Sequence, residues 1–136
     1  MAVAESLAAA VRARAQGRCQ YCLMHESLQG ATFHIEHIVP RSKGGASALE
    51  NLALACPGCN LRKSDTTAGA DPATGEPVAL FHPVQHVWSE HFRCKGYEVE
   101  GLSAAGRVTI VVLGLNHLRR QRIRQVEEIF GLYPAR

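Results

Sequence analysis

The sequence predicts a small α+β protein, and three observations lead to this fold class. Residues 2–16 are rich in alanine and have the apolar periodicity of a helix, whereas residues 33–39 alternate like a strand. Two Cys-x-x-Cys pairs enclose the alternating segment. A chain of 136 residues that is 46% hydrophobic can bury one core, so we expect a single domain over residues 1–136.

The first element in the chain is the N-terminal helix. Leu7, Ala8 and Val11 form its apolar stripe, and Gln16-Gly17 favours its end. We expect this helix to pack against the remainder of the domain.

The two cysteine pairs predict a metal site. Each pair has the spacing with which two thiolates reach one ion from a turn. A redox dithiol is the alternative, but it would not require a second pair that begins 34 positions after the first pair ends. We therefore expect four ligands of a structural zinc ion: Cys19, Cys22, Cys56 and Cys59.

The segment between the pairs predicts a hairpin. In a strand over residues 33–39, His34 and Glu36 lie on one face and His37 on the other. Glu36 and His37 can serve one site only where the strand ends or distorts, and Pro40 favours an end. Glycines at 44 and 45 permit a tight loop, after which residues 51–54 supply a second short strand or turn.

Residues 19–63 contain a series of motif elements in fixed order. They are Cys19-x-x-Cys22, Glu36-His37-Ile38-Val39-Pro40-Arg41-Ser42-Lys43-Gly44-Gly45, Glu50-Asn51-Leu52, and Cys56-x-x-Cys59-Asn60 with Lys63. This series resembles the zinc-stapled HNH endonucleases, whose name letters fall on His37, Asn51 and Asn60. Asn60 stands where the literal motif has histidine and keeps an oxygen ligand there. The motif covers about a third of the chain and is specific because about ten positions agree in order.

The resemblance implies a ββα-metal fold, in which the hairpin is followed by a helix that begins near the second cysteine pair. We expect residues 17–65 to form this core. Residues 66–136 are expected to pack on it as an extension, so that the core has flanking helices and a C-terminal hairpin plus helix.

The resemblance also implies how the site works. His37 would be the general base that takes a proton from water, while Glu36 and Asn60 would hold a divalent ion against the phosphate. Asn51 would brace the loop that carries His37 through backbone hydrogen bonds, a simple turn asparagine being the alternative. Oxygen ligands favour Mg²⁺ or Mn²⁺ over a second zinc, and Ser64 stands where some family members have another histidine.

Further side chains near the motif are candidates for substrate contacts. Basic side chains can grip phosphates without regard to base sequence. A histidine on the strand face of Glu36 can contact the substrate or have a purely structural role. The candidates are His34, Arg41, Lys43, Arg62 and Lys63.

The C-terminal region predicts several elements. We expect a turn-rich connector at 66–77, a helix from Pro83, a hairpin of 97–99 and 107–113 with its loop at 103–106, and a helix capped by Asn116. His82 and His86 are four apart, as ligands on a helix can be, but we expect them to be exposed or hydrogen-bonded. Cys94 stands alone and is expected to be buried.

The charge of the chain indicates which kinds of partner it could bind. The net charge of +3 is compatible with a polyanion and does not require one. Residues 118–125 offer a basic face that can dock DNA or pair with Glu127 and Glu128. Its arginines are Arg119, Arg120, Arg122 and Arg124.

The sequence also indicates the compartment. Charged residues interrupt every apolar run near the start, so we expect no secretory signal and a reducing, cytoplasmic setting. No segment approaches the ~18 apolar residues of a membrane span.

Together these features predict an HNH endonuclease, a phosphodiester hydrolase that nicks or cuts DNA with structural zinc and labile Mg²⁺ or Mn²⁺. RNA stays open as a substrate. A catalytically inactive zinc module that binds nucleic acid or protein is the alternative, and the presence of Glu36, His37 and Asn60 together argues against it. No feature of the sequence predicts cleavage specificity or oligomeric state.

Overall fold

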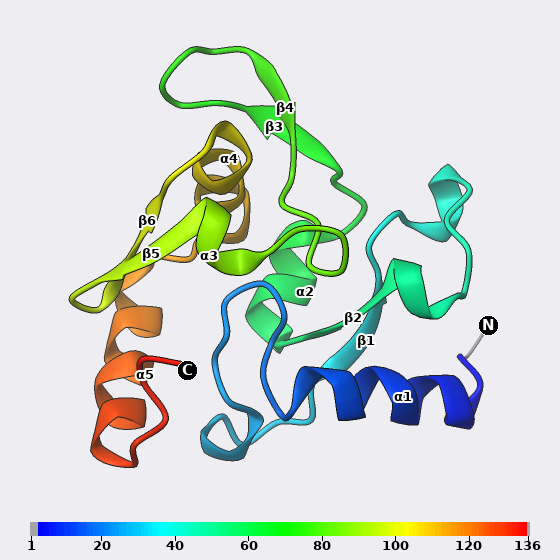
Figure 1. Cartoon of the computed structure of the whole chain (residues 1–136), viewed down its shortest axis with the longest axis horizontal. Coiled ribbons are helices and arrows are strands. Elements are labelled where there is room, and N and C mark those ends of the chain that lie inside the picture. The colour runs from blue at the N-terminus through cyan, green and yellow to red at the C-terminus, as the bar shows by residue number, and fades with distance from the viewer. Residues whose placement is uncertain (1–2, 136) are drawn as a thin grey trace.

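The computed structural model describes residues 3–135 and shows a mixed α+β protein (Figure 1). Within that range there are three two-stranded antiparallel sheets. The helices are α1 (Glu5–Ala15), α2 (Pro57–Lys63), α3 (Trp88–His91), α4 (Ala104–Leu113) and α5 (Leu118–Ile129). The strands are β1 (His34–His37), β2 (Leu52–Ala55), β3 (Ala68–Ala70), β4 (Pro77–Ala79), β5 (Phe92–Lys95) and β6 (Glu98–Gly101). Three short 3₁₀ helices cover Glu26–Leu28, Arg41–Lys43 and Leu49–Asn51.

The centre of the molecule is the β1–β2 hairpin followed by α2. β1 pairs with β2 with His37 opposite Leu52. α1 packs along β2, and α2 contacts both strands from the other side (Figure 1). Because β2 is covered by both helices, all four of its residues are buried. The predicted hairpin and helix are thus confirmed as a ββα unit.

The ends of α1 and α2 follow from local chemistry. α1 ends where Gln16 and Gly17 both take left-handed backbone conformations, with φ of 54° and 77°. α2 begins with Pro57 at its first turn, where the missing N–H costs nothing. The Sγ of Cys56 caps this helix by accepting the N–H of Cys59 at 3.4 Å.

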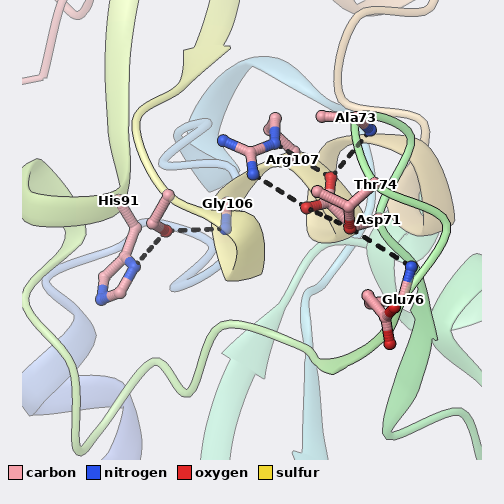
Figure 2. Close-up of polar contacts among 8 residues, drawn as sticks. Asp71, Ala73, Thr74, Glu76, His91, Gly106 and Arg107 are labelled. Atoms are coloured by element: carbon pink, nitrogen blue, oxygen red, sulfur yellow. Dashed lines mark hydrogen bonds and ion pairs between the residues drawn. The ribbon is translucent and has the colours of Figure 1, made fainter.

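The segment 66–77, expected to be a turn-rich connector, contains the strand β3 and a turn and ends at the start of β4. β3 and β4 form a small hairpin over α4 (Figure 1). Its turn is held by Asp71, whose carboxylate accepts the backbone N–H of Ala73 at 3.0 Å and two guanidinium N–H groups of Arg107 at 2.9 and 2.8 Å (Figure 2). This bidentate pair ties the hairpin to α4.

The expected strand at 107–113 is wrong, because these residues belong to α4. Ser103 caps the helix by accepting the N–H of Gly106 at 3.0 Å. Gly106 lies so close to the carbonyl oxygen of His91 that an added Cβ would be 2.1 Å from it. The hairpin of this region is β5–β6 instead, with its turn at Gly96, where φ is 61°.

Three smaller expectations also differ from the structure. The helix expected from Pro83 is a single turn, α3, that begins only at Trp88. Asn116 does not cap α5; its amide instead exchanges two hydrogen bonds with the backbone of Val99, at 2.7 and 2.8 Å, and His117 takes the cap position. Cys94 is exposed rather than buried.

One apolar core joins the central unit to the C-terminal elements. Phe33 and the residues of β2 pack in the same cluster as Phe81, Phe92 and Leu113. Over residues 3–135, no helix combines the length and the apolar character that crossing a bilayer would take.

Candidate metal centre and active site

Four thiols converge at the base of the ββα unit. The sulfur atoms of Cys19, Cys22, Cys56 and Cys59 all lie within 4.8 Å of one another, and all four residues are buried. Cys22 Sγ and Cys56 Sγ are 3.7 Å apart, far more than a disulfide allows. Tetrahedral zinc with Zn–S distances of about 2.3 Å places its sulfurs about 3.8 Å apart. The donor set and its spacing fit a structural zinc ion, which these four residues would hold.

α5 supplies a cation to this thiol cluster. Arg120 is buried, and its Nη1 donates to Cys59 Sγ at 3.3 Å and Cys56 Sγ at 3.8 Å, while Nη2 donates to the carbonyl of Leu113 at 3.2 Å. An added Cβ on Gly58 would be 2.7 Å from Nη2, so only glycine leaves room for this guanidinium. Since four thiolates around Zn²⁺ carry a net charge of −2, Arg120 offsets part of it.

Glu36 lies in the interior between β1 and α2. Its carboxylate accepts the hydroxyl of Tyr21 through Oε1, and Oε2 is 3.3 Å from the Nζ of Lys63. Burial raises the pKa of Glu36, while Lys63 and Tyr21 oppose that rise. The carboxylate is thus fixed on both oxygens by groups that come from two other parts of the chain.

His37 ends β1 and faces the following loop. Its Nε2 lies 2.8 Å from Ser47 Oγ and accepts the Nε–H of Arg41 at 3.3 Å. Because Arg41 can only donate, Nε2 is the nitrogen that carries the lone pair. Burial, followed by the charge of Arg41, lowers the pKa of His37. The lowered pKa favours the neutral imidazole, and the contact with Arg41 favours the tautomer whose Nε2 accepts.

Asn51 closes the loop between β1 and β2. Its Oδ1 accepts the N–H of Val39 at 2.9 Å, and its Nδ2 donates to the carbonyls of Val39 at 3.0 Å and Ala46 at 2.9 Å. Gly45 makes this closure possible, because an added Cβ there would be 1.7 Å from the Val39 carbonyl oxygen. The loop that carries Arg41 and Ser47 toward His37 is thereby fixed in place.

The region around Glu36 has features of a cation site. A buried carboxylate needs a positive partner, and in this structure the ammonium of Lys63 stands there. Asn60 lies one turn earlier on α2, and its side-chain amide makes no hydrogen bond with any of the residues 3–135. These oxygen donors fit a small hard divalent ion, which Glu36 and Asn60 would hold.

The remaining sequence-predicted contacts are spread around this region. His34, Arg41, Lys43 and Arg62 are exposed, whereas Lys63 is only 1% exposed and points inward. No hydrogen bond joins the side chains of Glu36 and His37 in the described part of the chain. The Lys63 ammonium contacts both residues, 3.3 Å from Glu36 Oε2 and 3.4 Å from the backbone carbonyl oxygen of His37.

The basic face expected at residues 118–125 was predicted from four arginines, and the prediction is wrong for two of them, which are buried. Arg120 and Arg124 are buried, and Arg124 donates to the carbonyl of Tyr97 at 2.9 Å. The expected ion pairs with acids do not form either, because Glu127 accepts the backbone N–H of His25 at 2.6 Å and Glu128 accepts the hydroxyl of Tyr97 at 2.6 Å. Only Arg119 and Arg122 are exposed.

His82 and His86 form hydrogen bonds with backbone groups close to them in sequence. His82 Nδ1 accepts the N–H groups of Val84 at 3.2 Å and Gln85 at 3.0 Å, and His86 Nδ1 accepts the N–H of His82 at 3.0 Å. Among residues 3–135, the four cysteines are the only group of three or more ligand side chains placed to hold a metal ion. The expectation that these histidines are hydrogen-bonded is confirmed.

The hairpin, the helix and the four thiols define a zinc-stapled ββα unit. Residues 19–66 match the model of the HNH endonuclease family, so this part of the chain is an HNH domain and the resemblance is confirmed. No curated protein and no solved structure matches the chain. An HNH domain indicates a nuclease-type activity on nucleic acid.

Three residues of the site were missed from the sequence. Tyr21 reaches Glu36, Ser47 reaches His37, and Arg120 reaches the thiols. For Arg120 a signal exists, since 120, 124 and 127 share one helical stripe with Ile123 and such a stripe faces the core. For Tyr21 and Ser47 no local pattern distinguishes them from other turn residues.

Proposed function

We propose that this protein is a metal-dependent endonuclease that hydrolyses phosphodiester bonds of DNA by nicking or double-strand cleavage. The observation that carries the proposal is the position of His37 at the end of β1 in a zinc-stapled ββα unit, with its Nε2 2.8 Å from Ser47 Oγ and 3.3 Å from Arg41 Nε. A general base that works near pH 7 needs a neutral imidazole, and the lowered pKa of His37 favours that form.

In the proposed reaction His37 takes a proton from the attacking water at Nε2. A water in the place of the Ser47 hydroxyl would be at hydrogen-bond distance, since that hydroxyl is 2.8 Å away. Asn51 acts indirectly by holding the loop that presents Arg41 and Ser47 to the imidazole. Arg41 and Lys43 leave this loop exposed, where they can contact neighbouring phosphates.

Glu36 and Asn60 are proposed to bind Mg²⁺ or Mn²⁺. Such an ion supplies charge neutralisation at the phosphate and at the departing oxygen. Arg62 and His34 are exposed on α2 and β1 and are proposed to contact the substrate. The zinc site would not touch the substrate; it would hold the hairpin and α2 together.

We further propose that residues 17–65 form the core of one domain on which residues 66–136 pack. A reducing compartment such as the cytoplasm would keep the four thiols available for zinc.

The test is relaxation of supercoiled plasmid by zinc-loaded protein with Mg²⁺ or Mn²⁺, with a matched single-stranded RNA in parallel. His37→Ala is expected to lower the DNA cleavage rate at least about 100-fold at unchanged zinc content, because the general base is lost. His86→Ala, an exposed histidine outside the site, serves as the control and should cleave like the wild type. Inactivity of the wild type on both substrates would favour the catalytically inactive binding module.

A further inference from the structure

Lys63 is a fully buried cation that the proposed reaction does not use. It is the last residue of α2, and its side chain is 2% exposed. The ammonium is 3.3 Å from Glu36 Oε2 and donates to the carbonyl of Ile38 at 2.8 Å. The Lys63 side chain therefore faces the protein interior and not a phosphate at the surface.

The neighbours of Glu36 show why the lysine is there. Among the described residues, Lys63 is the only basic side chain within 4.0 Å of this carboxylate. The second carboxylate oxygen is occupied by the Tyr21 hydroxyl. A buried carboxylate without a cation is strongly unfavourable, so the lysine stabilises Glu36 while no metal ion is bound.

A divalent ion held by Glu36 would compete with this ammonium, because the Tyr21 hydroxyl occupies Oε1 and the ammonium lies 3.3 Å from Oε2. Two cations on one carboxylate oxygen repel each other strongly where water is excluded. The ammonium also contacts the carbonyl oxygens of His37 at 3.4 Å and Ile38 at 2.8 Å. Lys63 can therefore give up Glu36 and keep these two hydrogen-bond acceptors, which makes an exchange of cations feasible without opening the core.

We infer that Lys63 is the resident counter-ion of Glu36 and that a divalent cation binds by displacing its ammonium from the carboxylate. This inference rests on the proposed function, because it takes Glu36 as a ligand of the ion. Lys63 is then a positioning residue that sets the affinity for the metal. It orients the Glu36 carboxylate in the metal-free protein and weakens metal binding in the absence of DNA.

The experiment measures Mn²⁺ binding to the full, zinc-loaded chain without DNA, from the electron paramagnetic resonance signal of free Mn²⁺. Lys63→Met should bind Mn²⁺ at least about tenfold more tightly than the wild type, because the competing charge is gone. Lys95→Met is the matched control. Lys95 is exposed on β5 and is not part of the proposed site, so the Mn²⁺ affinity of this variant should stay within about twofold of wild type.

Different results would contradict the displacement of Lys63 and the proposed ion site at Glu36. Equal or weaker Mn²⁺ binding by Lys63→Met, or no binding by either protein, overturns the proposed displacement of Lys63 by the divalent cation. If Lys63→Met is unchanged while Glu36→Gln loses Mn²⁺, the inference fails and the proposed ion site stands. If Glu36→Gln binds Mn²⁺ like the wild type, the ion site itself is wrong.

A second measurement needs no substitution and covers the case in which Lys63→Met fails to retain zinc. In wild-type protein with ¹⁵N-labelled lysine, the buried Lys63 ammonium should give a slowly exchanging NMR signal. Titration with Mg²⁺ should shift this signal and speed its hydrogen exchange as the contact with Glu36 breaks. A signal that is unchanged at saturating Mg²⁺ overturns the inference.

Discussion

Replacement of Arg120 by methionine tests whether the C-terminal helix stabilises the zinc site. The change removes the two contacts to Cys59 and Cys56 and the hydrogen bond to the Leu113 carbonyl. A hydrogen bond to a charged group is worth about 1.5–3 kcal/mol, and a buried carbonyl left without a donor costs about 1–3 kcal/mol. Methionine recovers part of the apolar contact, so we expect the free energy of unfolding to fall by about 3–5 kcal/mol.

The assay is guanidinium unfolding of the zinc-loaded protein, together with the rate of zinc transfer to a chromogenic chelator. Arg120→Met should unfold at lower denaturant and release zinc faster than the wild type. Arg119→Met, the exposed neighbour, should change the free energy of unfolding by no more than about 0.5 kcal/mol. If both variants have the same stability and the same zinc release rate, the proposed link between α5 and the metal site is refuted.

Three further predictions concern the core, the extension and the metal. Leu113→Ala, at a fully buried position, should lower the free energy of unfolding by about 2–5 kcal/mol in urea. Arg107 lowers the pKa of Asp71, so the pair stabilises the fold above pH ~4, the unfolded pKa, and this stability is lost as pH falls toward the lower folded pKa. The stability difference between wild type and Asp71→Asn should therefore shrink between pH 5 and pH 2. Removal of zinc by a strong chelator, or Cys59→Ser, should unfold the ββα unit as followed by circular dichroism.

Each of these predictions has a control. Val111 is 61% exposed, and Val111→Ala should leave urea stability nearly unchanged; an equal loss would show that burial is not the cause. A stability difference for Asp71→Asn that is constant with pH would contradict the ion-pair explanation. Cys94→Ser should keep full zinc content because the thiol lies outside the cluster, and zinc loss there would contradict the four-ligand site.

The central unit could be predicted because its sequence signals are local and agree with one another. The alternation around Glu36, the proline and glycines of the loop, and the spacing of the cysteines each specify geometry within a few residues. Gly45, for example, is required by one close contact with the Val39 carbonyl. The motif therefore predicts the hairpin, the helix and the thiol cluster together.

The C-terminal region could not be predicted as well, because its β-branched residues also suit a buried helix. Val108, Ile110 and Val112 alternate like a strand, yet the Ser103 cap and the need to cover β3 favour α4. The roles of Tyr21, Lys63 and Arg120 depend on contacts between distant parts of the chain, for which periodicity gives no signal. Such contacts exist only in the folded protein, where the packing of the helices and strands brings these residues together.

The contact of Arg120 with the thiols also bears on how the protein acquires its metal during synthesis. All four cysteines of the thiol cluster precede residue 60, so zinc can bind to a nascent chain before α5 has been made. Arg120 reaches Cys56 across 64 positions of sequence, so this contact can form only after α5 has been synthesised. A zinc ion bound before that point would lack the contacts of Arg120 with its thiolate ligands. A chain that includes α5 should therefore hold zinc for longer than a nascent chain that ends before it.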